Sequence, residues 1–313
     1  MKVDITSTKE YQQWLLELSR RQGDPVQGFF GPKSLVWQVN QELILHIAGP
    51  RALLLQMAHP MVAQGVADHS NFKEDFWGRA IRTFTTVYSI IFGTEEHALK
   101  AASRIHTVHS RIVGTLQEDV GRFKAGTPYQ ANDPNLLRWV YATLVDSALL
   151  TYQEYLEPTS YTLIDQSYTE MIQGARLFGV NEAWLPPTWM QFRAWMDDTI
   201  ASDEIVVSSV AKQISERLLA GPPGLSVLSP GVRIMCAGML PPKLRDAFGL
   251  DWNRRTRLSY GALQRMLKME VKRVPGRLRT VPIARSAHRR CRKHMRNEHM
   301  HCLGRFLRKA MLF

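Results

Sequence analysis

Two histidines, His106 and His109, lie three residues apart in the segment 105–114, IHTVHSRIVG. Apolar residues of the same expected helical stripe recur around them at spacings of three and four: Leu99, Ala102, Val113 and Leu116. A neutral imidazole that is buried on such a stripe must satisfy its nitrogens by hydrogen bonds or by a metal. The pattern alone is therefore compatible with a hydrogen-bonded pair of core histidines and with a metal or haem ligand.

Helix geometry limits how this pair could act. Side chains at positions i and i+3 emerge on the same side of a helix, so His106 and His109 cannot take the two axial positions of one haem. At most one of them would be a proximal haem ligand, or both could join further ligands on a non-haem metal. A ferritin-like di-iron centre requires Glu-x-x-His pairs on two helices, and the only such pair is Glu298–His301 in the basic C-terminal segment.

A second group of polar residues, Arg79, Arg82 and Thr86, recurs at spacings of three and four in the segment 71–92, which is otherwise aromatic and apolar. A guanidinium binds a carboxylate bidentately, so this stripe suits a buried anion such as a haem propionate. The alternative is a stripe that faces solvent or forms ion pairs within the protein.

A third group follows the apolar stretch 53–67 as Asp68-His69-Ser70. Short polar side chains at the end of a helix commonly form caps. Asp68 or His69 could instead act as an acid or base above an oxidising cofactor.

The elements that would position these residues are helical throughout. Apolar periodicity, caps and Pro or Gly breaks predict helices at 1–20, 35–48, 51–66, 71–92, 94–120, 135–156, 160–178, 187–199, 202–220 and 241–248. Pro50 is expected to separate the second helix from the third, and Gly93-Thr94 to separate the fourth from the fifth. No convincing alternating strand is seen. We expect an all-α protein with one multi-helix domain and a buried cofactor pocket.

The charge of the chain is concentrated in one segment. The 313 residues are 45% hydrophobic and 22% charged, with a net charge of +12. Residues 268–313 contain 14 Lys and Arg against Glu270 and Glu298, so this segment alone carries +12. Its end is both basic and apolar, which suits a flexible solvated tail or an amphipathic helix that binds an anionic membrane or an acidic partner. Nucleic acid is not expected, because aromatic stacking residues are sparse there.

Targeting signals are not apparent. The first twenty residues have no apolar core of a secretory signal, and no run of 18 apolar residues predicts a membrane span. The three cysteines have no framework spacing. We expect a cytoplasmic protein, with membrane association through its basic tail.

Residues about 25–290 resemble the MpaB-type oxygenase family, whose helical domain is shared with the rubber oxygenase called latex clearing protein. The resembling stretches are LILHIAGPRALLLQMAHPMVAQGVADHS, RTFTTVYSIIFGT, HTVHSRIVG, GTPYQANDPNLLRWVYATLVDSAL and VPIARSAHRR. Their order and spacing extend through most of the chain.

The resemblance implies a haem b that is buried among helices and held by one proximal histidine. His109 matches that ligand, and Arg82-x-x-x-Thr86 matches a pair that lies at the haem. His106 has no role in the family pattern and is expected to pack beside the ligand. Thr85 stands where the rubber oxygenase has a lysine able to cap the iron, so no such gate is expected here. The distal glutamate of that enzyme has no sure equivalent, and Asp68 is our nominee.

Our first hypothesis is a haem b-dependent oxygenase that acts with dioxygen on an apolar, unsaturated small substrate. Its catalytic residues would be Asp68, Arg82 and Thr86, its cofactor contacts Arg82, Thr86, His106 and His109, and its iron ligand His109. The alternative is a non-catalytic helical protein that binds haem or a lipid and uses its basic tail at a membrane or a partner. The expected domains are an N-terminal helix and linker (1–24), the oxygenase-like domain (25–284) and the basic tail (285–313).

Overall fold

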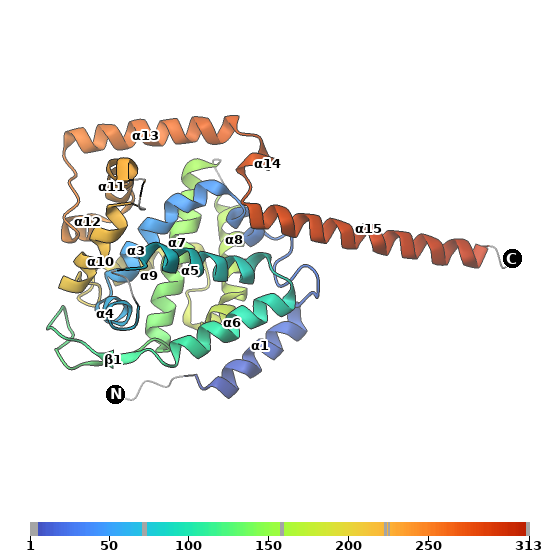
Figure 1. The fold of residues 1–313 in the computed structure, drawn as a ribbon, viewed down its shortest axis with the longest axis horizontal. Coiled ribbons are helices and arrows are strands. Elements are labelled where there is room, and N and C mark those ends of the chain that lie inside the picture. The colour runs from blue at the N-terminus through green and yellow to red at the C-terminus, as the bar shows by residue number, and fades with distance from the viewer. Residues whose placement is uncertain (1–5, 71–73, 157–159, 222–223, 225, 311–313) are drawn as a thin grey trace.

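A computed structural model describes residues 6–70, 74–156, 160–221, 224 and 226–310, with 297–310 described as backbone alone. The described chain is built from helices, and its single small sheet pairs β1 (Val113–Thr115) with β2 (Pro128–Gln130) in antiparallel register (Figure 1). The expected all-α class with one helical domain is confirmed.

In chain order, the α-helices of the described residues are α1 (Thr8–Gln22), α2 (Leu35–Asn40), α3 (Ala48–Met57), α4 (Pro60–His69), α5 (Phe76–Phe92), α6 (Glu95–His109), α7 (Pro134–Tyr155), α8 (Tyr161–Gln173), α9 (Trp189–Ala201), α10 (Ser209–Leu219), α11 (Ser229–Met239), α12 (Pro242–Ala247), α13 (Arg254–Arg273), α14 (Gly276–Arg279) and α15 (Pro282–Ala310). Short 3₁₀ helices connect several of them: η1 (Leu43–Ile47), η2 (Ala175–Phe178), η3 (Glu182–Trp184) and η4 (Ser226–Leu228).

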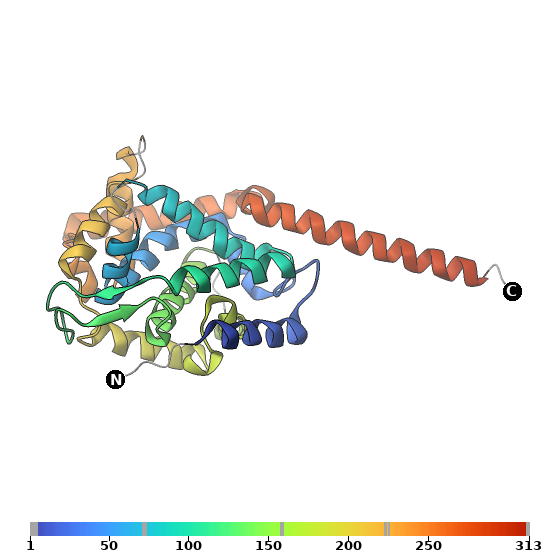
Figure 2. The same ribbon diagram turned by 60° about the horizontal axis from the view of Figure 1, so that its bottom comes forward.

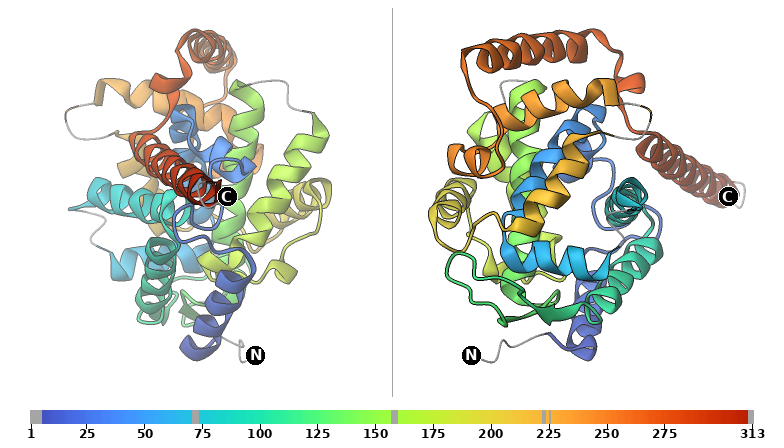
Figure 3. Two further views of the ribbon diagram at one scale, coloured as in Figure 1. Left: turned by 90° about the vertical axis from the view of Figure 1, so that its right-hand side faces the viewer. Right: turned by 60° about the vertical axis from the view of Figure 1, so that its left-hand side comes forward.

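Helix α7 is the central helix of the body, and α3 packs along it (Figure 3). Buried residues occur on all of its sides, as expected for a helix surrounded by others. Trp139 donates a hydrogen bond from Nε1 to the carbonyl of Leu55 at 3.1 Å, which fixes α7 against α3. The largest apolar cluster therefore lies around α7 and α3, with contributions from α8 to α12.

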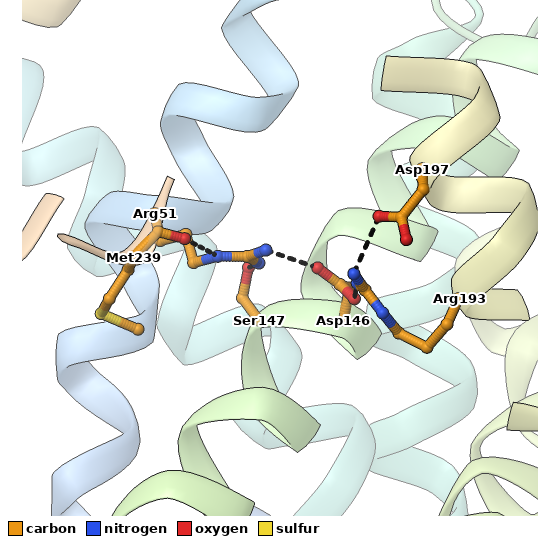
Figure 4. A network of polar contacts seen from close by, with 6 residues as sticks. All are labelled: Arg51, Asp146, Ser147, Arg193, Asp197 and Met239. Carbon is orange, nitrogen blue, oxygen red and sulfur yellow. Dashed lines mark hydrogen bonds and ion pairs between the residues drawn. The ribbon is translucent and has the colours of Figure 1, made fainter. Parts of the chain in front are cut away.

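A buried ion-pair network crosses this core (Figure 4). The Arg51 side chain is 3% exposed and the Asp146 side chain 0% exposed, and their Nη2 and Oδ2 atoms are 2.7 Å apart. Arg51 also donates to Ser147 Oγ at 2.7 Å and to the carbonyl of Met239 at 2.9 Å. Arg193 pairs with the other oxygen of Asp146. The network joins α3, α7, α9 and α11, and its buried charges are matched within the chain.

Two sequence expectations about helix breaks were wrong. Pro50 does not separate two helices but lies in the first turn of α3, where its missing N–H group has no helical partner to lose. The break falls instead at Ala58-His59, ahead of Pro60, which begins α4. Helix α2 ends at Asn40, and η1 (Leu43–Ile47) takes the place of the end of the expected helix 35–48.

The expected helix 94–120 is also too long, because α6 ends at His109. The β-branched residues Ile112, Val113 and Thr115 follow it, and the last two belong to β1, which pairs with β2 in a hairpin that the sequence did not predict. Gly114 lies in β1 under Tyr129, and a Cβ atom there would be 2.5 Å from the Tyr129 hydroxyl oxygen.

The C-terminal part of the fold contains two long basic helices. Helix α13 lies along one edge of the body, and α15 leaves the body and projects away from it (Figure 2). The sequence had not predicted α11 or α13 as helices. No helix in the described part of the chain is long and apolar enough to cross a membrane.

Candidate functional site

Helices α5 and α6 hold the residues singled out by the sequence, and the tight connection between them fixes their relative position. Gly93 ends α5, and a Cβ atom there would be 2.1 Å from the carbonyl oxygen of Ser89. Thr94 caps α6 through a hydrogen bond from the backbone N–H of His97 to its Oγ1 at 3.3 Å. The predicted stop and start signals are both confirmed.

His109, the last residue of α6, has the most unusual surroundings among the described histidines of this region. Its Nδ1 atom is buried and has no hydrogen-bond partner among the described residues. Burial, and after it the neighbouring His106 and Arg79, lower the pKa of His109 to about 4. The imidazole is therefore neutral at physiological pH, which is the form that binds a metal.

Arg79, on α5, lies close enough to His109 to lower its pKa. The side chain is half-buried, and no hydrogen bond or ion pair joins its guanidinium to another residue that the structure describes. Burial, together with the charge of Arg82, lowers the pKa of Arg79. A partly desolvated cation without a carboxylate partner is unusual in a folded protein.

Arg82 and Thr86 lie on the same helix but have local partners. The Arg82 side chain is 66% exposed and forms an ion pair with Asp75, with 2.8 Å between Nη1 and Oδ2. The Thr86 hydroxyl donates to the backbone carbonyl of Arg82 at 2.8 Å. Arg79 is thus the arginine of the stripe whose charge acts on His109, although the pair matched to the family was Arg82 and Thr86.

His106 differs from His109 although one helical turn separates them. Its ring is 5% exposed and stacks on Tyr11 of α1, with ring centroids 4.4 Å apart and an interplanar angle of 11°. Its Nε2 is 3.2 Å from the carbonyl oxygen of Thr6, and Asn132 donates to its backbone carbonyl at 3.2 Å. His106 therefore has the contacts of a core histidine that anchors α1 to α6.

Asp68, at the end of α4, points to the hairpin. The Tyr129 hydroxyl donates to Asp68 Oδ2 at 2.6 Å, and Gln64 donates to Oδ1 at 2.8 Å. Burial and the hydrogen bond to Asp68 raise the pKa of Tyr129. No contact in the described part of the chain joins Asp68 to His109. The neighbouring His69 places its Nε2 2.9 Å from the carbonyl oxygen of Val113.

A ring cluster that the sequence did not indicate covers another side of α5. His46 Nε2 is 3.3 Å from the Tyr88 hydroxyl, and the rings of His46 and Phe84 are 5.7 Å apart. Gly49 lies under Phe84, and a Cβ atom there would be 2.8 Å from the Phe84 ring. The small residue in the AGPR motif therefore allows α3 and α5 to approach closely at this cluster.

Multidentate metal binding by side chains finds no support in the described residues. They contain no group of three or more His, Cys, Asp or Glu side chains placed to hold a metal ion. What α5 and α6 bring together is one neutral imidazole and one unpaired guanidinium. A prosthetic group that supplies its own metal donors and carries a carboxylate matches this pair.

Comparison with known proteins gives a family for the chain. Residues 36–269 match the model of a family described as ER-bound oxygenase mpaB/B'/rubber oxygenase, catalytic domain. No curated protein and no solved structure matches significantly. The matched region covers more than half of the chain and contains α3 to α12 and most of α13, including both helices of the candidate site. The chain therefore belongs to the family of mpaB-type and rubber oxygenase catalytic domains.

Proposed function

We propose that this oxygenase-family protein is a haem b-dependent oxygenase in which His109 is the only protein ligand of the iron. The observation that carries the proposal is the buried, unpartnered Nδ1 of a histidine whose pKa is lowered to about 4. A neutral imidazole with an unused nitrogen has the donor chemistry of a proximal haem ligand.

Arg79 supplies the second contact in this proposal. Its guanidinium has no anion among the described residues, and a haem propionate is an anion that it would bind through charge-assisted hydrogen bonds. Arg82 and Thr86, which match the family pair, remain proposed contacts at the edge of the site, although Arg82 is paired with Asp75 in this structure. His106 would keep α6 in place through its contacts with Tyr11 and Thr6.

The chemistry of the reaction belongs to the cofactor, because a haem held by one imidazole supplies an iron on which dioxygen is activated. The residues of the chain would orient the substrate and exclude water from the site. Ile81 and Phe84, 64% and 37% exposed, give α5 an apolar side that suits an apolar, unsaturated substrate, although it is not the side that carries Arg79. Asp68, with its hydrogen bond from Tyr129, is the proposed proton-carrying group at Oδ2.

The absorption spectrum tests the cofactor and its ligand. Protein expressed with added haem precursor should show a Soret band, and His109→Gly should lose it while free imidazole restores it. The matched control is His106→Ala, on the same helix, which should keep the band and unfold more easily. A colourless wild-type protein, or a His109→Gly protein that binds haem as tightly as the wild type, would refute the proposal.

Oxygen uptake with apolar unsaturated substrates separates catalysis from binding alone. The oxygenase should consume dioxygen in proportion to substrate, and Asp68→Asn should slow turnover while leaving the Soret band unchanged. Haem binding without turnover on any such substrate would instead favour the alternative, a haem- or lipid-binding protein.

The proposed partners also include an anionic membrane surface reached by the basic tail. In the described structure α15 projects away from the helical body (Figure 2), and its described side chains include Arg289, Arg292, Lys293 and Arg296. The cytoplasmic location that the sequence suggests stays part of this proposal. Sedimentation with anionic vesicles tests this partner, because reversing the charges of Arg289 and Arg292 leaves the candidate site untouched.

A further inference from the structure

Helix α13 has two opposite apolar faces, although only one of them packs against the body. Its inner face joins a buried cluster through Val271, with Tyr260, Leu263 and Leu267 packed against the same cluster. On the opposite side Leu258, Met266 and Met269 are 65%, 47% and 50% exposed. With exposed Ala262 they recur at spacings of four, four and three, so they form one stripe. We refer to these four residues as the outer face of α13.

Basic side chains flank the outer face. Between residues 254 and 279 there are nine Lys and Arg residues against Glu270, and Glu270 pairs with Arg273 at 3.2 Å. Five of these basic side chains on α13 have no ion pair or hydrogen bond with other described residues: Arg254, Arg255, Arg257, Arg265 and Lys272. On a helical projection Arg255 and Arg273 fall within the outer face, and Arg254, Arg265 and Lys272 fall at its border. Positive charge thus lies within the apolar stripe and along one of its borders.

Exposed apolar residues and basic residues also occur together in the segment that follows α13. A cleft of about 640 Å³ lies between α14 and the first turns of α15, and four arginines line it: Arg277, Arg285, Arg289 and Arg292. No carboxylate is among its lining residues. Leu278 and Ile283, at the two sides of this connection, are 61% and 36% exposed. We call this the arginine cleft.

We propose that the outer face of α13, together with the arginine cleft, docks the protein on an anionic lipid bilayer. Leucine and methionine side chains would enter the interfacial region, and the surrounding guanidinium groups would bind lipid phosphates and carboxylates. Helix α13 lies along one edge of the body (Figure 1 and Figure 3), and the residues of its outer face are exposed, so a planar surface can reach them. The membrane partner proposed above, on which this surface depends, would then contact the folded body and the start of α15 rather than the end of that helix.

A bilayer explains the composition of this surface better than a nucleic acid does. Binding to single-stranded nucleic acid combines positive charge with aromatic stacking, and the outer face contains Leu, Met and Ala without an aromatic residue. Exposed apolar residues would contribute little to a purely electrostatic contact with phosphates. Their alternation with unpaired arginines is typical of interfacial amphipathic helices.

Vesicle sedimentation tests the proposal. The full-length protein should bind phosphatidylcholine vesicles that contain phosphatidylserine and should not bind phosphatidylcholine alone. A variant that combines Leu258→Ser, Met266→Ser and Met269→Ser should bind the phosphatidylserine-containing vesicles with an affinity at least about tenfold lower, because it removes the apolar part of the contact. The matched control combines Leu16→Ser on α1 with Met190→Ser on α9, which are 57% and 66% exposed, and it should bind like the wild type.

Further variants separate the two basic surfaces. Arg254→Glu with Arg265→Glu should abolish binding to the anionic vesicles, whereas Arg305→Glu with Arg308→Glu near the C-terminus should leave most of it. If the triple serine variant binds the vesicles as tightly as the wild type, or if the C-terminal reversals alone abolish binding, the proposal is wrong. It is also wrong if the surface binds single-stranded RNA instead of vesicles and the serine changes leave that binding intact. Since the serine changes lie on exposed side chains, circular dichroism should show an unchanged fold.

Discussion

Two buried or partly buried arginines of this molecule have opposite surroundings. Arg51 is 3% exposed, and its guanidinium contacts the Asp146 carboxylate, the Ser147 hydroxyl and the Met239 carbonyl (Figure 4). Arg79 is half-buried beside His109, and its guanidinium has no partner among the described residues. The guanidinium of Arg51 is fully paired, whereas that of Arg79 is left without a counter-charge in the part of the chain that the structure describes. The first arginine therefore stabilises the fold, and the second is the one that we propose as a ligand contact.

Removal of the partner of Arg51 should have the largest effect. Asp146→Ala should destabilise the protein by about 3–5 kcal/mol, because it leaves a guanidinium buried without its counter-charge. The free energy of unfolding in urea measures this effect. Asp197→Ala is the matched control, since the Asp197 side chain pairs with Arg193 but is 65% exposed, and it should cost less than about 1 kcal/mol. Equal effects of the two substitutions would contradict the structural role of the buried network.

A second test uses pH, because protonation of His109 in acid should oppose folding. The pKa of His109 is lowered from 6.5 to about 4, chiefly by burial. Between these values the unfolded chain binds a proton that the folded chain does not, so stability falls as the pH falls from 6.5 towards 4. The loss should be on the order of 3 kcal/mol in the cofactor-free protein.

His109→Leu is the control for this pH effect. The substitution removes the titrating group and replaces an unpaired buried nitrogen by an apolar side chain of similar size. The variant should match or exceed the wild type in stability near neutral pH and should lose less stability on acidification. Urea unfolding at a series of pH values between about 4 and 7 measures both. A parallel loss in the two proteins would show that His109 titrates normally in the folded state.

Local sequence predicted the helices of this site and the break between them. It could not predict the contacts between segments that are distant in the sequence. Gly93 and Thr94 signal a helix end and a helix start by their own conformational preferences, and both signals were right. The spacing of Arg79 and Arg82 predicted one helix, but it could not show which of them faces α6. Adjacent turns of a helix can face different environments, and here that separates a half-buried guanidinium from one that is 66% exposed.

The two histidines show the same limit. His106 and His109 looked equivalent by spacing, and only the contact with Tyr11, far earlier in the chain, makes His106 a packing residue. The β1–β2 hairpin was missed because its three-residue strands are too short for an alternating pattern. The long apolar helix α7, in contrast, was predicted almost to its ends, since its composition alone requires burial on every side.

A third prediction concerns haem affinity and tests the proposed role of Arg79 directly. Arg79→Gln should weaken haem binding by about 10- to 100-fold, because a hydrogen bond between charged groups contributes roughly 1.5–3 kcal/mol. Haem titration followed at the Soret band measures the effect. Arg82→Gln, on the same helix, should change the affinity much less, since Arg82 is exposed and paired with Asp75. The reverse order would favour the family pair over Arg79 as the propionate contact.

The smallest effect is expected at the exposed end of the same stripe, where an arginine is paired but not buried. The Arg82–Asp75 pair has 66% and 50% exposed side chains, so solvent and salt screen it. In a double-mutant cycle with Arg82→Gln and Asp75→Asn, the coupling free energy of unfolding should be below about 0.5 kcal/mol. A coupling of several kcal/mol would mean that this pair is held as firmly as Arg51–Asp146. Exposure would then not explain why Arg51 stabilises the fold while Arg79 is proposed to bind a ligand.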